Sequence, residues 1–121
     1  MTNAEIARAW LDAVMARDYE GVVSLLADDY RLRDLSPPGF TEVSGSVTVV
    51  SRMRERLDTV DAWRLVESDV YEIGPVTYVR ARVHFIHPEA GELMLEQHHL
   101  LTIADQRIRA IDQLCTGFFA P

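Results

Sequence analysis

Residues 76–119 read VTYVRARVHFIHPEAGELMLEQHHLLTIADQRIRAIDQLCTGFF, and this stretch decides the fold. Apolar and polar side chains alternate along it as they do along half-buried β-strands. Turn-forming residues interrupt the alternation at Pro88–Gly91 and at Asp105-Gln106. With an upstream segment that ends at Gly74-Pro75, the pattern predicts four long antiparallel strands joined as a meander. The predicted strands are Ala62–Ile73, Val76–His87, Glu92–Ala104 and Arg107–Phe118.

The N-terminal half has the spacing of helices. Thr2-Asn3-Ala4-Glu5 has the pattern of a capping box, and apolar residues then recur every three or four positions. Asp18 can cap a second, short helix. A third apolar pattern fits a helix, although its Val-Thr-Val-Val run also has strand propensity. The predicted elements are helices Asn3–Arg17, Asp18–Asp28 and Gly45–Leu57, a short strand Tyr30–Arg33 and a loop Ser36–Gly39.

Helices that precede antiparallel strands indicate an α+β fold, in which the helices cover one face of a curved sheet. The 121 residues fit a single domain, 1–121, that can bury a substantial core. Long strands with short turns would curve around the helices. The sequence therefore predicts a container with an apolar interior.

Composition removes several classes of function. Nineteen acidic against twelve basic residues give a net charge of −7, which argues against nucleic-acid binding. The chain has no lysine, so Schiff-base chemistry is excluded. No apolar run reaches the ~20 residues of a membrane span, and no secretion signal is visible. The single cysteine, Cys115, excludes an internal disulfide and favours a reducing, cytoplasmic setting.

Three polar side chains fall on the apolar face of the predicted sheet. Gln97, His99 and Gln113 occupy positions where a simple core would have valine or leucine. Burying such groups without partners costs about 1–3 kcal/mol each, so the pattern predicts a ligand-accessible cavity. The alternative is that they bond one another or fixed water. Arg109 and Cys115 share this face of the last strand and join the expected pocket.

The opposite face of the sheet mixes charged and large apolar side chains. This mixture fits either a solvated surface or the interface of a homodimer, and we favour the dimer. His98 and His99 point in opposite directions and cannot share a metal, so we expect no metal site. No phosphate loop, dinucleotide fingerprint or Ser-His-Asp pattern is present, and we expect no cofactor. The charged and imidazole groups of this face are Arg80, Arg82, His84, Glu96 and His98.

The order of the predicted elements resembles the nuclear transport factor 2-like superfamily, which includes ketosteroid isomerases and SnoaL-like polyketide cyclases. The most specific part is RDYEGVVSLLADDYRLRD, Arg17–Asp34, and the likeness covers nearly the whole chain. The resemblance implies a cone-shaped α+β barrel with a pocket at its wide end, and frequent homodimers. Superfamily members include enzymes and non-catalytic binding modules, so membership alone does not settle function.

Carried over residue by residue, the resemblance places the general base of the isomerases at Asp34. The isomerase's tyrosine donor falls at Trp10, and its protonated aspartate falls at His99, so both oxyanion donors are changed. We expect His99 to act as an imidazolium acid, or as a neutral proton shuttle or enolate stabiliser. The remaining expected substrate contacts are Gln97, Gln113, Trp10, Arg109, Cys115 and Phe40.

These residues suit a cofactor-independent cyclase, isomerase or dehydratase that acts on a small apolar carbonyl compound, such as a polyketide intermediate. The alternative is a non-catalytic ligand-binding or dimerisation module. A pocket filled by Trp10, Phe40 and Phe118 would count against an enzyme. A third reading, epoxide hydration, rests on Asp34 and Arg109 alone.

Overall fold

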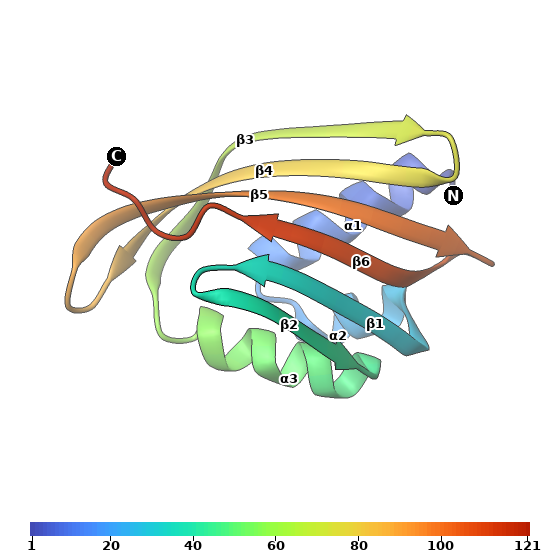
Figure 1. Ribbon diagram of the computed structural model, residues 1–121, viewed down its shortest axis with the longest axis horizontal. Coiled ribbons are helices and arrows are strands. Elements are labelled where there is room, and N and C mark those ends of the chain that lie inside the picture. Colours follow the sequence, from blue (N-terminus) through green and yellow to red (C-terminus); the bar gives the residue numbers. More distant parts are fainter.

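The computed structural model describes residues 1–121 as three helices and a six-stranded sheet (Figure 1). The helices lie together on one face of the sheet, and the long strands curve over them. The elements are α1 (Asn3–Met15), α2 (Tyr19–Leu25), β1 (Leu26–Ser36), β2 (Gly39–Ser44), α3 (Ser46–Leu57), β3 (Asp61–Ile73), β4 (Val76–His87), β5 (Gly91–Ala104) and β6 (Arg107–Cys115).

The strand order is β2-β1-β6-β5-β4-β3. β3 to β6 form the predicted antiparallel meander, and β1 and β2 form an antiparallel hairpin. β1 joins the meander by pairing with β6 in parallel, so the sheet is mixed. The α+β class is confirmed, with helices packed against a curved sheet. The sheet is open, however, because its edge strands β2 and β3 do not pair with each other.

The predicted helices are present, and the first two end earlier than predicted, at Met15 and Leu25. Thr2 and Glu5 form the capping box, in which each side chain accepts a hydrogen bond from the other residue's backbone N–H. Asp18 caps α2 by accepting from the Gly21 N–H at 3.0 Å. That helix ends at Leu25 because Leu26 begins pairing with β6. The segment with strand propensity forms α3, as predicted.

The hairpin of β1 and β2 differs from the sequence prediction. The short strand expected at Tyr30–Arg33 is an eleven-residue strand, and β2 was not predicted. β2 is an edge strand whose side chains are nearly all exposed, so it has no buried alternation to recognise. The predicted Ser36–Gly39 loop becomes the tight turn of the hairpin, and the Pro37-Pro38 bond in it is cis.

Strand alternation places side chains as predicted along β4 and β5. Val79, Ala81, Val83 and Phe85 are at most 3% exposed. In β6 the alternation breaks at Arg109, where a bulge shifts the register between β5 and β6. The bulge lets Ile108 and Ile111 both point inward, at three positions apart instead of two.

The core has two parts. The larger packs α1 and α3 against the sheet, and the smaller lies near the end of the sheet where β4 ends and β5 begins. The smaller cluster consists of Val60, Val83, Phe85 and Leu95. None of the three helices combines the length and the apolar composition needed to cross a membrane. The smaller cluster matters for function because Val60, Phe85 and Leu95 also line a cavity.

Candidate functional site

A cavity of about 670 Å³ lies at the end of the molecule where β1, β4 and β6 end. These strand ends lie at the left in Figure 1. The wall of the cavity comes from the β1–β2 hairpin, the end of α3, the start of β3, the meander and the C-terminal residues. Phe40 and Phe118 line it but are each 61% exposed. They therefore stand at the mouth and do not fill the interior.

Three predicted residues lie side by side on adjacent strands. Asp34 of β1 is opposite Gln113 of β6, and Gln113 is opposite His99 of β5. The parallel pairing of β1 with β6 is what brings the aspartate into this row. The row joins the cavity to a smaller inner compartment of about 140 Å³, which all three residues line.

Asp34 is 4% exposed and lines both spaces. Its Oδ1 accepts hydrogen bonds from the Ser36 hydroxyl and from Gln113 Nε2, the latter at 3.1 Å. Its Oδ2 faces Arg56 Nη1 at 3.8 Å and accepts no hydrogen bond. One carboxylate oxygen is thus fixed by the protein, and the other is open to a reaction partner.

His99 is 2% exposed. Burial, with a smaller effect from nearby His98, lowers its pKa to about 3, and a hydrogen bond with Gln113 opposes the shift more weakly. The imidazole is therefore neutral near pH 7, because a buried charge has no compensating partner here. Of the two forms expected from the sequence, this favours the neutral one over the imidazolium. The Nδ1 atom is buried without a hydrogen-bond partner.

Trp10 is 4% exposed and packs edge-on against His99, with ring centroids 5.0 Å apart. It belongs to the main core, and it also lines the inner compartment. Trp10 therefore forms the helix-side wall behind the histidine.

The remaining predicted contacts divide into two groups. Gln97, Cys115 and Phe40 line the cavity. Arg109 does not, and the expectation that it lies in the pocket is wrong. The β6 bulge turns it outward, where its guanidinium pairs with Asp105 at 3.2 Å and Asp29 at 3.7 Å.

Several cavity residues escaped the sequence reasoning. Trp63 lines both spaces, and its Nε1 is buried without a partner. Arg52 and Arg56 of α3 also contribute to the walls. Their i, i+4 spacing on a helix predicted to cover the sheet was the available signal. Ser36 lies two residues after Asp34 on the same strand, so alternation places both side chains on one face. The prediction of a loop at Ser36–Gly39 hid this relation.

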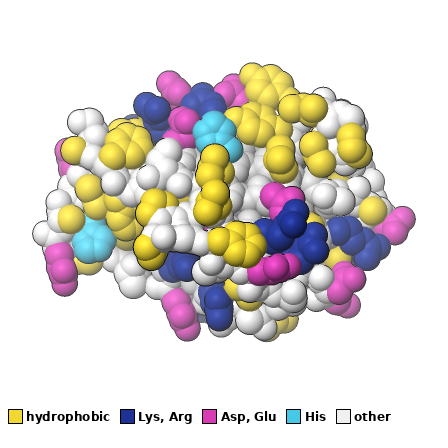
Figure 2. Space-filling model, viewed as in Figure 1, with side chains coloured by type: hydrophobic (Ala, Val, Ile, Leu, Met, Phe, Trp, Pro, Cys, Tyr) yellow, Lys and Arg dark blue, Asp and Glu magenta, His cyan; other side chains and the backbone are white.

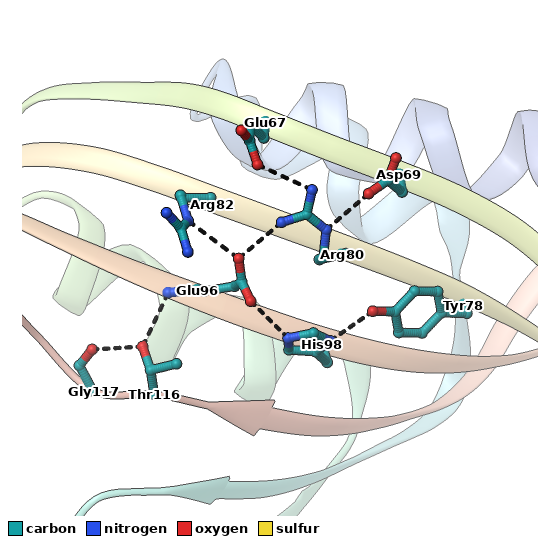
Figure 3. Close-up of polar contacts among 9 residues, drawn as sticks. All are labelled: Glu67, Asp69, Tyr78, Arg80, Arg82, Glu96, His98, Thr116 and Gly117. Carbon is teal, nitrogen blue, oxygen red and sulfur yellow. Dashed lines mark hydrogen bonds and ion pairs between the residues drawn. The ribbon is translucent and has the colours of Figure 1, made fainter.

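The outer face of the sheet carries charged groups among apolar ones (Figure 2). Arg80 lies at the centre of a polar network and contacts Asp69 at 2.8 Å, Glu96 at 2.8 Å and Glu67 at 3.1 Å (Figure 3). These carboxylates raise the pKa of Arg80. His98 continues the network, with Nε2 at 3.0 Å from Glu96 and Nδ1 beside the hydroxyl of Tyr78. The outer face therefore pairs most of its charges internally.

The same face exposes large apolar side chains around this network. Leu114 is opposite His98 in the β5–β6 register, and Leu100 is opposite Tyr78 in the β4–β5 register. Tyr71 stacks on Tyr78 at 6.0 Å between ring centroids. Apolar groups thus border the network on several strands.

The fold and the cavity define a class of protein: a cone-shaped α+β structure with a polar-lined, largely apolar pocket at its open end. The model of the SnoaL-like domain family matches residues 7–111. The chain therefore belongs to the SnoaL-like family of the nuclear transport factor 2-like superfamily, and the resemblance seen in the sequence is confirmed. Among curated proteins, none matches the sequence significantly.

Solved structures share this fold at low sequence identity. A protein of ketosteroid isomerase-like fold from Catenulispora acidiphila, in complex with trimethylamine, gives a TM-score of 0.78 at 16% identity over 93% of this chain and 85% of that one. A candidate SnoaL-like polyketide cyclase from Shewanella putrefaciens gives 0.78 at 14% identity over 95% and 90%. An LEH-like epoxide hydrolase from M. tuberculosis gives 0.72 at 16% identity over 92% and 80%.

Proposed function

We propose that this protein is a cofactor-independent enzyme that moves a proton next to the carbonyl group of a small, largely apolar compound. Cyclisation, isomerisation and loss of water all begin with such a step. The observation that carries the proposal is the buried Asp34 carboxylate, which has one oxygen held by Gln113 and Ser36 and the other free beside an open cavity. The cyclase assigned to a structural neighbour agrees with this class of chemistry.

In the proposed reaction, Asp34 Oδ2 takes a proton from the carbon next to the carbonyl, and the electron pair of that C–H bond moves to form the enolate. The enolate oxygen then needs a donor. His99 can supply an N–H as neutral imidazole, which is one of the two forms expected from the sequence and a weaker acid than imidazolium. Gln97 and Trp10 would orient the ring of the substrate. Asp34 returns the proton to a different carbon, or to a leaving hydroxyl group.

Deuterium exchange tests the first step without knowledge of the natural substrate. The α-hydrogens of 2-tetralone, a bicyclic ketone, would be followed by NMR in D₂O. We expect the protein to accelerate their exchange, and Asp34→Asn to reduce that acceleration about 10²- to 10⁴-fold. Asp28→Asn, at an exposed acid of the same strand, is the matched control. Exchange that is unchanged in both Asp34→Asn and His99→Ala would refute the mechanism.

The alternative function is a non-catalytic ligand-binding module. It is favoured by the two changed donor positions, Trp10 and His99, and by the neutral state of the histidine. Tetralone that binds in the cavity without accelerated exchange would support it. Epoxide hydration, which the M. tuberculosis neighbour performs, loses support here because Arg109 lies away from Asp34.

We also propose that the outer sheet face forms a homodimer. The charges of this face are mostly paired within one chain. A second copy can therefore cover the exposed leucines without burying an unpaired charge. Leu114→Arg should shift the sedimentation coefficient to that of a monomer, whereas Val47→Arg on α3 should not. A wild-type monomer at all concentrations would refute the dimer. The cytoplasmic setting remains a prediction from the single cysteine.

A further inference from the structure

Three arginines of α3 differ in where they point. Arg52 and Arg56 are one helical turn apart, and both contribute to the cavity walls. Arg54, between them, lies on another side of the helix. Its guanidinium is 3.5 Å from Asp58 Oδ2 and 5.3 Å from the centre of the Tyr19 ring. Two of the three positive charges are therefore directed to the site.

The two cavity arginines have few partners within the protein. Arg56 has the single ion pair with Asp34 at 3.8 Å, which is longer than a hydrogen bond. Arg52 makes no ion pair or side-chain hydrogen bond at all. Arg80 on the outer face, by contrast, is held by three carboxylates. The guanidinium donors of α3 are thus available to a ligand.

The charges around the cavity do not balance. Asp34 is the only acidic residue that lines either compartment, against the two arginines. One positive charge is uncompensated, in a chain whose net charge is −7. Both arginines are largely exposed, with 72% of the Arg56 side chain accessible to solvent. Their attraction for an anion therefore comes from the uncompensated charge at the cavity wall and is screened by salt.

The walls around this charge specify the rest of the ligand. Apolar side chains from six parts of the chain surround a volume of about 670 Å³, which is enough for a compound of one to three rings. A ligand with a single negative charge would neutralise the site, whereas a phosphate dianion would leave one charge unpaired. The apolar lining includes Phe40, Leu57, Trp63, Phe85, Leu95 and Phe118.

We propose that the ligand of this cavity is an organic monocarboxylate, with its carboxylate held at Arg56 and Arg52 and its apolar body in the outer cavity. The inference rests on the proposed function and narrows its substrate to a carbonyl compound that also carries a carboxylate. The arginine fork can bind the two carboxylate oxygens together, which fixes the orientation of the ligand relative to Asp34.

Calorimetric titration at pH 7 and low salt tests the proposal with three probes of one shape: 2-naphthoate, neutral 2-naphthamide and cationic 2-naphthylmethylammonium. We expect naphthoate to bind about tenfold or more tightly than the amide. Arg56→Gln should remove this advantage, because it should weaken the binding of naphthoate far more than that of the amide. Arg54→Gln is the matched control on the same helix and should preserve the advantage. Added salt should reduce the difference in affinity between 2-naphthoate and 2-naphthamide.

Equal affinities for acid and amide, or a preference for the ammonium probe, would overturn the inference. An Arg54→Gln loss as large as that of Arg56→Gln would also overturn it, because a general surface charge would then explain the preference. The proposed function fails separately, if 2-tetralone exchange is no faster with the protein than without it. If the protein accelerates tetralone exchange but does not prefer naphthoate to naphthamide, the proposed function stands and only the proposal of a carboxylate on the substrate fails.

Discussion

Gln113 Nε2 donates a hydrogen bond to Asp34 Oδ1 across 3.1 Å, although 79 positions separate the two residues. The parallel pairing of β1 with β6 sets them directly opposite each other. The carboxylate is buried, so this bond replaces one that water would otherwise supply. The amide therefore both stabilises the fold and fixes the orientation of the proposed base.

Replacement of Gln113 by leucine should destabilise the protein by about 1–3 kcal/mol, because it removes a donor from a buried carboxylate. Gln97→Leu is the matched control, since Gln97 lines the same cavity and makes no side-chain hydrogen bond. We expect that control to change the free energy of unfolding by less than about 0.5 kcal/mol. Urea unfolding at pH 7 measures both. Equal losses would show that the Asp34 bond contributes nothing specific.

His99 should make stability depend on pH in the acid range. Its pKa is about 3 in the folded protein, against 6.5 as an ordinary value. Between these values the unfolded chain binds a proton that the folded chain does not, so the free energy of unfolding falls as pH falls. The contribution is fully present above pH 6.5, and the slope is at most about 1.4 kcal/mol per pH unit.

The clean window for this effect is pH 6.5 to 4.5, above the range in which carboxylates titrate. His99→Leu should lose stability less steeply than the wild type across this window, in urea unfolding at half-unit steps of pH. Gln97→Leu, which changes no titrating group, should run parallel to the wild type. A parallel curve for His99→Leu would mean that the imidazole is solvated in the folded protein.

Glu96 should make stability depend on pH in a lower range, below about pH 4.5. Its burial raises the pKa, but hydrogen bonds from His98, Arg80 and Arg82 outweigh burial and leave the pKa below the ordinary 4.5. The stability that results is present above pH 4.5 and is lost as pH falls through the folded value. Between pH 5 and 3, the free energy of unfolding of Glu96→Gln should therefore fall by less than that of the wild type, with a difference on the order of 1 kcal/mol. Thermal unfolding between pH 5 and 3 measures this difference. The same loss of stability in Glu96→Gln and in the wild type would contradict the prediction.

The sequence was sufficient for the parts of the fold that depend on local periodicity. Alternation placed Gln97, His99 and Gln113 on the inner face. Gln97 and Gln113 line both spaces of the site, and His99 lines the inner compartment. The general-base position, Asp34, came from the resemblance and also lies there. Each of these predictions concerns one strand or one motif, where period-two geometry or residue identity carries the information.

Pairing between distant segments was beyond that reasoning. The parallel β1–β6 contact has no local signature, yet it sets Asp34 beside Gln113. The bulge at Arg109 shifts a register by one residue and turns a predicted pocket residue outward. The charge state of His99 depends on burial by Trp10 and other residues remote in sequence. Tertiary packing, not propensity, decides all three.

Gly117 shapes the mouth of the cavity, where the C-terminal residues pass the β1–β2 turn. Its φ is +74°, and a Cβ there would lie 3.0 Å from Cγ of Pro37. Gly117→Ala therefore combines backbone strain of about 1–2 kcal/mol with a steric contact at the rim. We expect it to lower the free energy of unfolding and to weaken 2-naphthoate binding, because relief of the contact displaces residues that line the cavity.

Two glycines separate these effects. Gly74→Ala has the same kind of strain, at φ +55°, but its Cβ meets nothing within 4 Å. It should cost stability without changing ligand affinity. Gly39→Ala lies on the cavity wall with open space around its Cβ, and should change neither quantity appreciably. If Gly117→Ala weakened naphthoate no more than Gly74→Ala does, the contact with Pro37 would have no part in forming the mouth, and the rim would tolerate a wider opening than the structure indicates.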